Sequence, residues 1–288
     1  KAGLIGMLSA WLARVPVRIH WMTGQVWVTK SGFTRWYLRK LDQLTARLAT
    51  HLLVDSHSQM TFLIQQRIAA ESKMSVLQSG SICGVDFQKF RPDIEIRSEL
   101  RKSLDIGNGD LVLLFVGRLC HDKGVHDLLS MYTELPEENV PHLILVGTDE
   151  EGIESEWKSR LVSRRNTVHF IGHSNEPERY MAASDIFVIP SHREGFGLSV
   201  IEAAAVGIPS IGSDIYGLCD SIEDGSTGLL VPASDTGTLG RAVCFLLLNA
   251  RERLQLGRNA RNRALTQFNS ELLTQEYLDF LNNFCIRK

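Results

Sequence analysis

The sequence that decides the fold of this 288-residue chain is Pro190-Ser191-His192-Arg193-Glu194-Gly195-Phe196-Gly197-Leu198-Ser199-Val200-Ile201-Glu202-Ala203-Ala204-Ala205. An apolar run at residues 185–189 comes directly before it and is typical of a buried parallel strand. The stretch then passes through a glycine-bearing loop into an alanine-rich segment that favours a helix. A strand, a glycine loop and a helix in this order indicate an α/β fold with a parallel sheet.

Two carboxylates in this stretch suggest a ligand. Glu194 lies in the expected loop, and Glu202 lies eight positions later inside the expected helix. Backbone N–H groups at a helix start attract phosphate, and carboxylates accept hydrogen bonds from sugar hydroxyls. A solvent-exposed helix carboxylate is disfavoured for Glu202, because its neighbours are small and apolar; an ordinary loop acid stays open for Glu194. Together the two residues predict a nucleotide-sugar site.

A second loop carries two cations. Gly117-Arg118-Leu119-Cys120-His121-Asp122-Lys123-Gly124 follows the apolar run 111–116, at the carboxyl end of an expected strand, where α/β proteins bind their ligands. Arg118 and Lys123 stand five positions apart and could clamp a diphosphate. The alternative is that both are solvated loop charges.

The second part of the chain is predicted to hold five or six strands of a doubly wound parallel sheet, with helices between them. The apolar runs lie at residues 111–116, 142–146, 168–171, 185–189, 209–212 and 228–231. Helices are expected over 95–104, 237–249, 251–267 and 270–284. We therefore predict a nucleotide-sugar-binding Rossmann-like domain at 86–270, and a C-terminal helix at 271–288 that crosses back to the first domain.

The first part of the chain is too short for a complete domain of this kind. Helical patterns lie at 4–14, 34–50 and 58–69, but only two or three strands are expected, including 17–21 and 51–55. Since the chain begins with Lys1 and not with Met, residues 1–85 are expected to be the C-terminal part of a truncated Rossmann-like acceptor domain. Residues 79–92, which lack periodicity, are the expected linker.

Charge is unevenly distributed along the chain. Residues 1–91 carry 12 Lys/Arg against 4 Asp/Glu, and the remainder carries 19 against 29. The difference predicts either complementary domains or a basic surface for anionic lipid head groups or a phosphate-bearing acceptor. A helix that combines Arg35, Trp36, Tyr37, Arg39 and Lys40 could touch such a membrane surface, although a solvated helix face with two anchoring aromatics is the alternative.

Several classes of protein are disfavoured. The five cysteines are scattered and show no metal-ligand spacing, which favours reduced thiols in a cytoplasmic protein. No apolar run is long enough to span a membrane, and no signal peptide is recognised. The chain has no Walker loop, and Gly195-Phe196-Gly197 lacks the third glycine of a nicotinamide fingerprint. We expect no bound metal, no other cofactor and no nucleic-acid partner.

At these residues the chain resembles the retaining glycosyltransferases of the GT-B fold, family 4, also called glycosyltransferase group 1. The likeness covers nearly all of residues 50–280. Residues 17–80 look most similar to the branch that builds bacterial capsule, O-antigen and related lipopolysaccharide. Further matches are Ala183-Ser184-Asp185, Pro190-Ser191, Gly207-Ile208-Pro209, Gly217, Asp224-Gly225 and Thr227-Gly228.

The resemblance implies a role for each matching residue. Arg118 and Lys123, beside Gly117, would hold the donor diphosphate and stabilise the leaving group. Glu194 would hydrogen-bond the transferred sugar, and Glu202 would hold the ribose hydroxyls. The remaining donor contacts would be the backbone amides of Gly195, Phe196, Gly197 and Leu198, with the base near Ile171 and His173. Family members usually need no metal, because the cations do its electrostatic work.

The acceptor side departs from the family. Its members often have His directly before a Gly at the end of a strand in the N-terminal domain, facing the sugar. Here Thr23 precedes Gly24, and His20 stands four positions before that glycine. The acceptor-side contact is therefore assigned to the group His20, Thr23 and Gly24.

The function expected from the sequence is a retaining, metal-independent glycosyltransferase. It would move a sugar from a nucleotide-diphosphate donor, a UDP-sugar or else a GDP-sugar, to a glycan or lipid-linked acceptor. It would work in the cytoplasm, in peripheral contact with the inner face of the plasma membrane. The alternatives are a sugar-nucleotide epimerase or phosphorylase of the same fold, or a donor-binding module that is inactive as a fragment.

Overall fold

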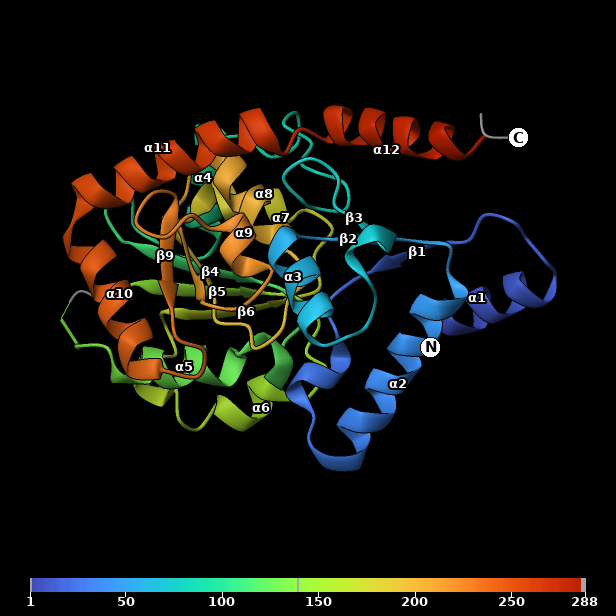
Figure 1. The fold of residues 1–288 in the computed structure, drawn as a ribbon. Coiled ribbons are helices and arrows are strands. Elements are labelled where there is room, and N and C mark those ends of the chain that lie inside the picture. Colours follow the sequence, from blue (N-terminus) through green and yellow to red (C-terminus); the bar gives the residue numbers. More distant parts are fainter. Residues whose placement is uncertain (1, 139, 286–288) are drawn as a thin grey trace.

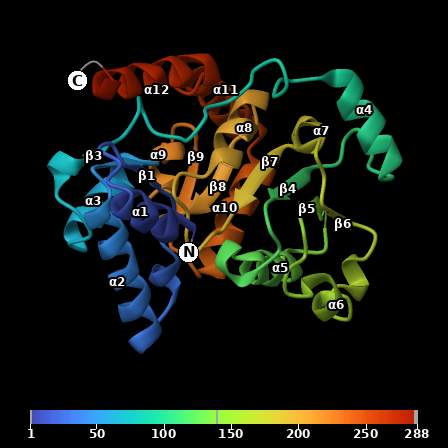
Figure 2. The same ribbon diagram turned by 90° about the vertical axis from the view of Figure 1, so that its right-hand side faces the viewer.

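The computed structural model describes residues 2–138 and 140–285 and contains two parallel sheets, each wound with helices. Figure 1 shows a large sheet between two layers of helices and, beside it, a small sheet with helices of its own. Figure 2, turned by 90°, separates α1, α2 and α3 from the helices of the large sheet.

The large sheet has six parallel strands in the order β6-β5-β4-β7-β8-β9. In chain order the strands are β4 (Val112–Val116), β5 (His142–Val146), β6 (Val168–Gly172), β7 (Ile186–Ile189), β8 (Ser210–Ser213) and β9 (Gly228–Val231). The four central strands are almost wholly buried and the two edge strands are half-buried, because helices cover both faces. All six predicted strands are present, and the order reverses between β4 and β7, where α/β folds bind ligands.

Two layers of helices cover the large sheet (Figure 1). One face carries α5 (Val125–Glu134), α6 (Ile153–Trp157) and α10 (Thr236–Leu248). The other face carries α4 (Ile94–Ser103), α7 (Pro177–Ala183), α8 (Leu198–Val206) and α11 (Ala250–Gln267). Short 3₁₀ turns occur at Val26–Thr29, Glu71–Lys73, His121–Lys123 and Val162–Arg164. The small alanine side chains of α8 allow it to pack closely on α11.

The small sheet has the order β1-β2-β3, again parallel. It consists of β1 (Ile19–Met22), β2 (His51–Val54) and β3 (Met74–Ser75), with α1 (Ala2–Leu12), α2 (Gly32–Leu48) and α3 (His57–Gln65). A core around Trp27, Leu52 and Leu63 joins the sheet to these helices. The third strand, which the sequence left open, has two residues.

The chain crosses between the two sheets twice, and the crossings lie side by side. Val85 N–H donates to Phe268 O (2.7 Å), and Ser270 N–H donates to Val85 O (3.2 Å). The last helix, α12 (Ser270–Cys285), then runs back beside the small sheet (Figure 1) and contacts it through two ring pairs, Trp21–Tyr277 and His51–Phe284. Residues 286–288 of the predicted returning helix lie outside the described residues, and boundaries at 85 and 270 remain our proposal.

Three helices end at least two residues earlier than their apolar patterns indicate. The patterns over 4–14, 34–50 and 58–69 give helices that end at Leu12, Leu48 and Gln65. Just after the first and third of these ends, Arg14 (φ 56°) and Arg67 (φ 54°) take the left-handed conformation, through which no helix continues. Pro16 is a stop signal for the first helix, but neither arginine marks the exact end, because neither is a glycine.

Candidate functional site

Two loops from the large sheet form one wall of a cleft. The loop after β4 carries Arg118 and Lys123, and the loop after β7 carries Glu194; these strands are neighbours at the reversal of strand order. Lys123 Nζ lies 2.5 Å from Glu194 Oε1, which also accepts a hydrogen bond from Ser191 Oγ (3.0 Å). Arg193 Nη2 and Asp122 Oδ2 join the same loops at 3.0 Å. These contacts hold the two loops together.

The predicted cations and the predicted glycine loop face the same space. A pocket of about 270 Å³ is lined by Arg118, Lys123, Glu194 and residues 195–198. Thr23 and Gly24, from the small sheet, line its other side. Sequence reasoning therefore identified residues on both walls of this pocket.

The loop after β7 presents its backbone to the pocket. Gly197 takes a left-handed conformation (φ 85°) and forms the N-cap of α8, which starts at Leu198. The Phe196 side chain is turned inward, edge-on to Phe268, with ring centroids 5.3 Å apart. Because the first N–H groups of a helix have no partner within it, the start of α8 offers hydrogen-bond donors to an anion.

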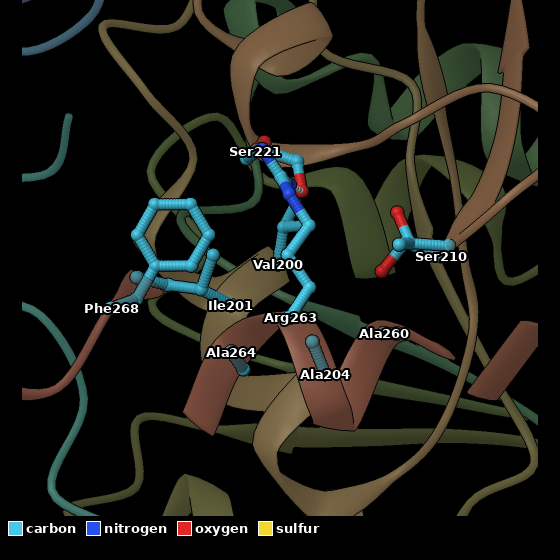
Figure 3. Close-up of a pocket in the computed structure, with 10 residues that line it drawn as sticks. Val200, Ile201, Ala204, Ser210, Ser221, Ala260, Arg263, Ala264 and Phe268 are labelled. Carbon is cyan, nitrogen blue, oxygen red and sulfur yellow. Dashed lines mark hydrogen bonds between the residues drawn. The ribbon is translucent and has the colours of Figure 1, made fainter. Parts of the chain in front are cut away.

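The opposite side of α8 is held firmly. Figure 3 shows Arg263, from α11, reaching Ser221 across a space bounded by Val200 and Ile201. Arg263 donates to Ser221 O (2.9 Å) and Asp220 O (2.6 Å). The enclosed cavity measures about 10 Å³, roughly one water molecule, so it is no substrate site. The contacts instead tie α11 to the short helix α9 (Leu218–Ser221), which precedes β9.

Glu202 lies one turn into α8 and does not line the 270 Å³ pocket. Burial raises the pKa of its carboxyl to about 7; the charge of Lys89 opposes the shift and that of Glu178 adds to it. No hydrogen bond to its side chain is formed within the described part of the chain. Lys89, which sequence reasoning missed, bonds Glu178 Oε2 (3.4 Å) and Asn175 O (3.3 Å), and so ties the interdomain linker to this region.

The other residues predicted to bind the sugar donor also lie outside the lining of the 270 Å³ pocket. Ile171 packs half-buried against the core, and exposed His173 contacts Asn175 Oδ1 at 3.2 Å. Gly117 continues the sheet by donating its N–H to Val146 O (2.9 Å). The structure therefore links His173 to Asn175 and Asn175 to Lys89, outside the lining of the 270 Å³ pocket.

The acceptor-side group is divided between two hollows. Thr23 and Gly24 line the 270 Å³ pocket and also a larger hollow of about 720 Å³ between α1, β1 and α2. His20 lines only the larger hollow, where burial lowers the pKa of its imidazole. Thr23 and Gly24 therefore line the pocket that contains Arg118 and Lys123, whereas His20 does not. The acceptor-side contact assigned to His20 stays a prediction.

Four further residues line the smaller pocket and were missed: Asp55, Ser81, Ile82 and Arg193. Asp55 directly follows β2, so the strand-end rule that found Arg118 would also have found it. It is 3% exposed, and its Oδ1 accepts a hydrogen bond from Trp21 Nε1 (2.6 Å). Burial raises the pKa of this carboxyl to about 7, and the nearby charge of Glu194 adds to the shift.

The two sheets meet at this pocket through backbone contacts. A Cβ on Gly24 would lie 3.0 Å from Gly195 N and 3.1 Å from the carbonyl carbon of Glu194. Arg193 Nη1 donates to Gly24 O at 2.9 Å, and Gly217 N–H donates to Ser58 Oγ at 2.7 Å. The pocket is therefore enclosed by both sheets.

No helix among residues 2–138 and 140–285 is long and apolar enough to cross a membrane. No group of three or more His, Cys, Asp or Glu side chains in those ranges could hold a metal ion.

Comparison with known proteins gives a consistent result. The family model "Glycosyl transferases group 1" matches residues 96–263. The chain is 30% identical over 287 residues to the capsular polysaccharide biosynthesis glycosyltransferase CapM of Staphylococcus aureus, covering 99% of this chain and 75% of CapM. It is 29% identical to N,N'-diacetylbacillosaminyl-diphospho-undecaprenol alpha-1,3-N-acetylgalactosaminyltransferase of Campylobacter jejuni, covering 96% of this chain and 73% of that protein.

The fold is shared with a solved structure. Anabaena HepE, crystallised with UDP-glucose, superposes with a TM-score of 0.85 at 23% identity, covering 98% of this chain and 76% of HepE. The similarity extends over 98% of this chain, so its fold is a known architecture.

The close approach at Gly24 can be tested by adding one methyl group. Gly24→Ala should open the cleft or displace residues 194–195, since its Cβ would lie 3.0–3.1 Å from backbone atoms. We expect donor turnover to fall at least roughly tenfold, with a loss of stability of about 1–3 kcal/mol. Gly6→Ala, where a Cβ meets nothing within 4 Å, is the control for both measurements. Unchanged turnover in Gly24→Ala would contradict the close approach.

Proposed function

The chain belongs to the glycosyl transferases group 1 family, and on this basis we propose that it transfers a sugar from a nucleotide-diphosphate donor to a glycan or lipid-linked acceptor. The predicted GT-B fold is confirmed, and so is the prediction of a glycosyltransferase of surface-polysaccharide synthesis. The relatives favour this function over an epimerase, a phosphorylase or a module without activity.

One observation carries the assignment of the donor site. Arg118, Lys123 and the amide-bearing loop 195–198 converge on one pocket of about 270 Å³. Positive side chains and unpaired backbone N–H groups at one place suit a diphosphate. A donor phosphate entering the pocket would meet Lys123, which is held in place by Glu194.

We assign the residues of the cleft to steps of the transfer. Breaking the bond between the anomeric carbon and the diphosphate leaves negative charge on the leaving group, which Arg118 and Lys123 would stabilise. Glu194 would accept hydrogen bonds from the transferred sugar. Arg193 adds a third cation to the pocket wall, which supports the proposal that side chains here supply the electrostatic work of a divalent ion.

The finer features of the reaction follow the family resemblance. We propose that the transfer retains the anomeric configuration, and that the donor is a UDP-sugar, with a GDP-sugar as the alternative. UDP-glucose is the ligand named for the HepE crystal. Glu202 would hold the ribose hydroxyls, and the base would lie beside Ile171 and His173.

Lys123→Ala tests the proposed clamp. Losing this cation should cost about 2–4 kcal/mol of transition-state stabilisation, or roughly 30- to 1000-fold in kcat/KM for the donor. The unfolding midpoint should change far less, because a partly exposed pair adds little to stability. Radiolabelled transfer from a panel of UDP-sugars and chemical denaturation give the two readouts. Lys158→Ala, an exposed lysine of the same domain, is the control. Equal losses of turnover and stability would contradict the clamp.

Glu202 predicts a proton release when nucleotide binds. Its pKa of about 7 without ligand should fall when ribose hydroxyls donate hydrogen bonds to the carboxylate, because such bonds favour the charged form. Near neutral pH, UDP binding should therefore release a fraction of a proton, and affinity should fall as the pH drops below about 7.

Calorimetry in buffers of different ionisation enthalpy measures that release. Glu202→Gln should abolish it while UDP still binds, with weaker affinity. The same proton release from the wild type and from Glu202→Gln would assign the titration to another group and remove Glu202 from the ribose site.

We further propose peripheral contact with the cytoplasmic face of the membrane, through α2. Phe33, Trp36 and Tyr37 are 74%, 54% and 48% exposed, and Phe33 stacks on both other rings. Such a cluster of exposed aromatics suits a lipid interface. Two of the predicted cations are used internally: Arg35 lies over the Trp27 ring, and Arg39 donates to Gln66 O. The contact is therefore more apolar than the sequence indicated.

Vesicle association tests this surface. The double variant Phe33→Ser with Trp36→Ser should reduce binding to vesicles of phosphatidylglycerol and phosphatidylcholine at least several-fold, because it removes the exposed rings. Binding should also weaken between roughly 0.1 and 0.5 M salt, since the first part of the chain is basic. Leu248→Ser, equally apolar and 85% exposed on α10, is the control. Wild-type binding by the double variant would refute the proposal.

A further inference from the structure

Asp55 occupies a distinctive place in the cleft. It directly follows β2 and lies beside the end of β1, on the wall contributed by the small sheet. Its backbone N–H donates to Gln59 Oε1 (3.0 Å), and its Oδ1 accepts from Trp21 Nε1 (2.6 Å). One hydrogen bond thus holds the backbone of Asp55, and another holds its carboxyl group.

The second oxygen of Asp55 points at the donor loop. A Cβ on Gly195 would clash with Asp55 Oδ2, so this oxygen lies against the Gly195 backbone. Within residues 2–138 and 140–285, no hydrogen bond to Oδ2 and no salt bridge to Asp55 is formed. Glu194, on the opposite wall, is instead bonded to both Lys123 and Ser191. One carboxylate of the pocket is therefore paired with a cation, and the other is not.

Asp55 also differs from its neighbours on the same wall. The small-sheet side of the pocket is formed by Thr23, Gly24, Asp55, Ser81 and Ile82. Of these described residues, Asp55 alone carries a group that can take up a proton near neutral pH. Since the large sheet supplies the diphosphate clamp, the acceptor should approach from the small-sheet side.

We propose that Asp55 is the catalytic base that takes the proton of the acceptor hydroxyl during transfer. Because we propose that the configuration is retained, the acceptor oxygen forms its bond to the anomeric carbon on the same face from which the diphosphate oxygen departs. The hydroxyl proton moves to Asp55 Oδ2, and the electron pair of the broken bond leaves with the diphosphate, held by Arg118 and Lys123. This inference rests on the proposed donor site.

The electrostatics of the pocket are compatible with this role. Burial raises the pKa of Asp55 to about 7, Trp21 lowers it and the charge of Glu194 raises it. The other charged groups on the pocket wall are Arg118, Lys123 and Arg193, from the two loops of the large sheet. A base whose pKa lies near the working pH combines adequate ionisation with proton affinity.

The test is the pH dependence of transfer by Asp55→Asn. The rate is measured with whichever of UDP-glucose, UDP-galactose, UDP-GlcNAc or UDP-GalNAc the wild type uses, to N,N'-diacetylbacillosaminyl-diphospho-undecaprenol or, failing that, to water. The wild-type kcat should rise with pH through about 7, as Asp55 ionises. Asp55→Asn should lose this dependence of kcat on pH. Its kcat should fall roughly 10²- to 10⁴-fold, with the KM for the donor nearly unchanged.

Two further variants sharpen the result. Trp21→Phe removes a hydrogen bond to the ionised carboxylate, so the acidic limb should move to higher pH while the rate above it is kept. Asp42→Asn is the matched control, because Asp42 is also buried and accepts a hydrogen bond from an indole, Trp27 Nε1 (2.7 Å). It lies on α2, beside the same small sheet, and lines the larger hollow but not the smaller pocket. It should leave the pH profile unchanged. Circular dichroism and thermal melting confirm that each variant is folded.

Two results would overturn the inference. In the first, Asp55→Asn keeps the acidic limb, which would assign the proton to another acceptor such as the departing phosphate. In the second, it raises donor KM with kcat unchanged, which would make Asp55 a donor-binding group. Failure of the donor site itself is recognised separately, because Lys123→Ala would then transfer sugar as fast as the wild type.

Discussion

The site depends on one contact between backbones, at Gly24 of the small sheet and Gly195 of the large one. The Cβ that any other residue would place at Gly24 lies 3.0 Å from Gly195 N, so the two walls of the cleft approach as closely as the backbone permits. Gly217 adds a third backbone to this junction, and Ser58 and Asp220 bridge the sheets next to it. This closeness lets residues distant in the sequence line one small pocket. It also brings Asp55, from the small sheet, against the backbone of Gly195, which we propose binds the sugar donor.

The remainder of the large domain holds the loops of that pocket in place. The β4 loop and the β7 loop belong to neighbouring strands, and the pairs Lys123–Glu194 and Arg193–Asp122 cross between them. Behind the β7 loop, α8 is packed on α11, with Arg263 bonded to the carbonyls of residues 220 and 221. Rigid support of this kind matters for an electrostatic site, because donors that are already oriented need not reorganise when charge develops. The fold therefore contributes to the proposed chemistry by limiting motion of the clamp.

Much of this could be predicted from the sequence, and the misses have physical reasons. Most strands of the large sheet are short, largely apolar runs, and this pattern predicts their bounds to within one residue. Arg118, Lys123 and Glu194 follow such strands, and parallel strands bring their carboxyl ends to one edge. Asp55 follows a strand too, but it was read as the last residue of that strand. The contact of Gly24 with Gly195 could not be read at all, because 171 positions separate them and a glycine does not reveal its neighbour.

The three carboxylates to which we assign roles in transfer have different surroundings, which set their charge near neutral pH. Glu194 is paired with Lys123, so its charge helps to place the cation. Among residues 2–138 and 140–285, no cation forms a salt bridge with Asp55 or Glu202, and burial raises the pKa of each to about 7. A site for a diphosphate would repel its ligand if every carboxylate in it were permanently charged. Asp55 and Glu202 can each hold a proton near neutral pH, which reduces this repulsion while the donor enters. Each can then ionise when a hydroxyl of the donor or acceptor offers it a hydrogen bond. The same burial that destabilises the charged form of these residues therefore suits them to a site that alternates between binding an anion and accepting a proton.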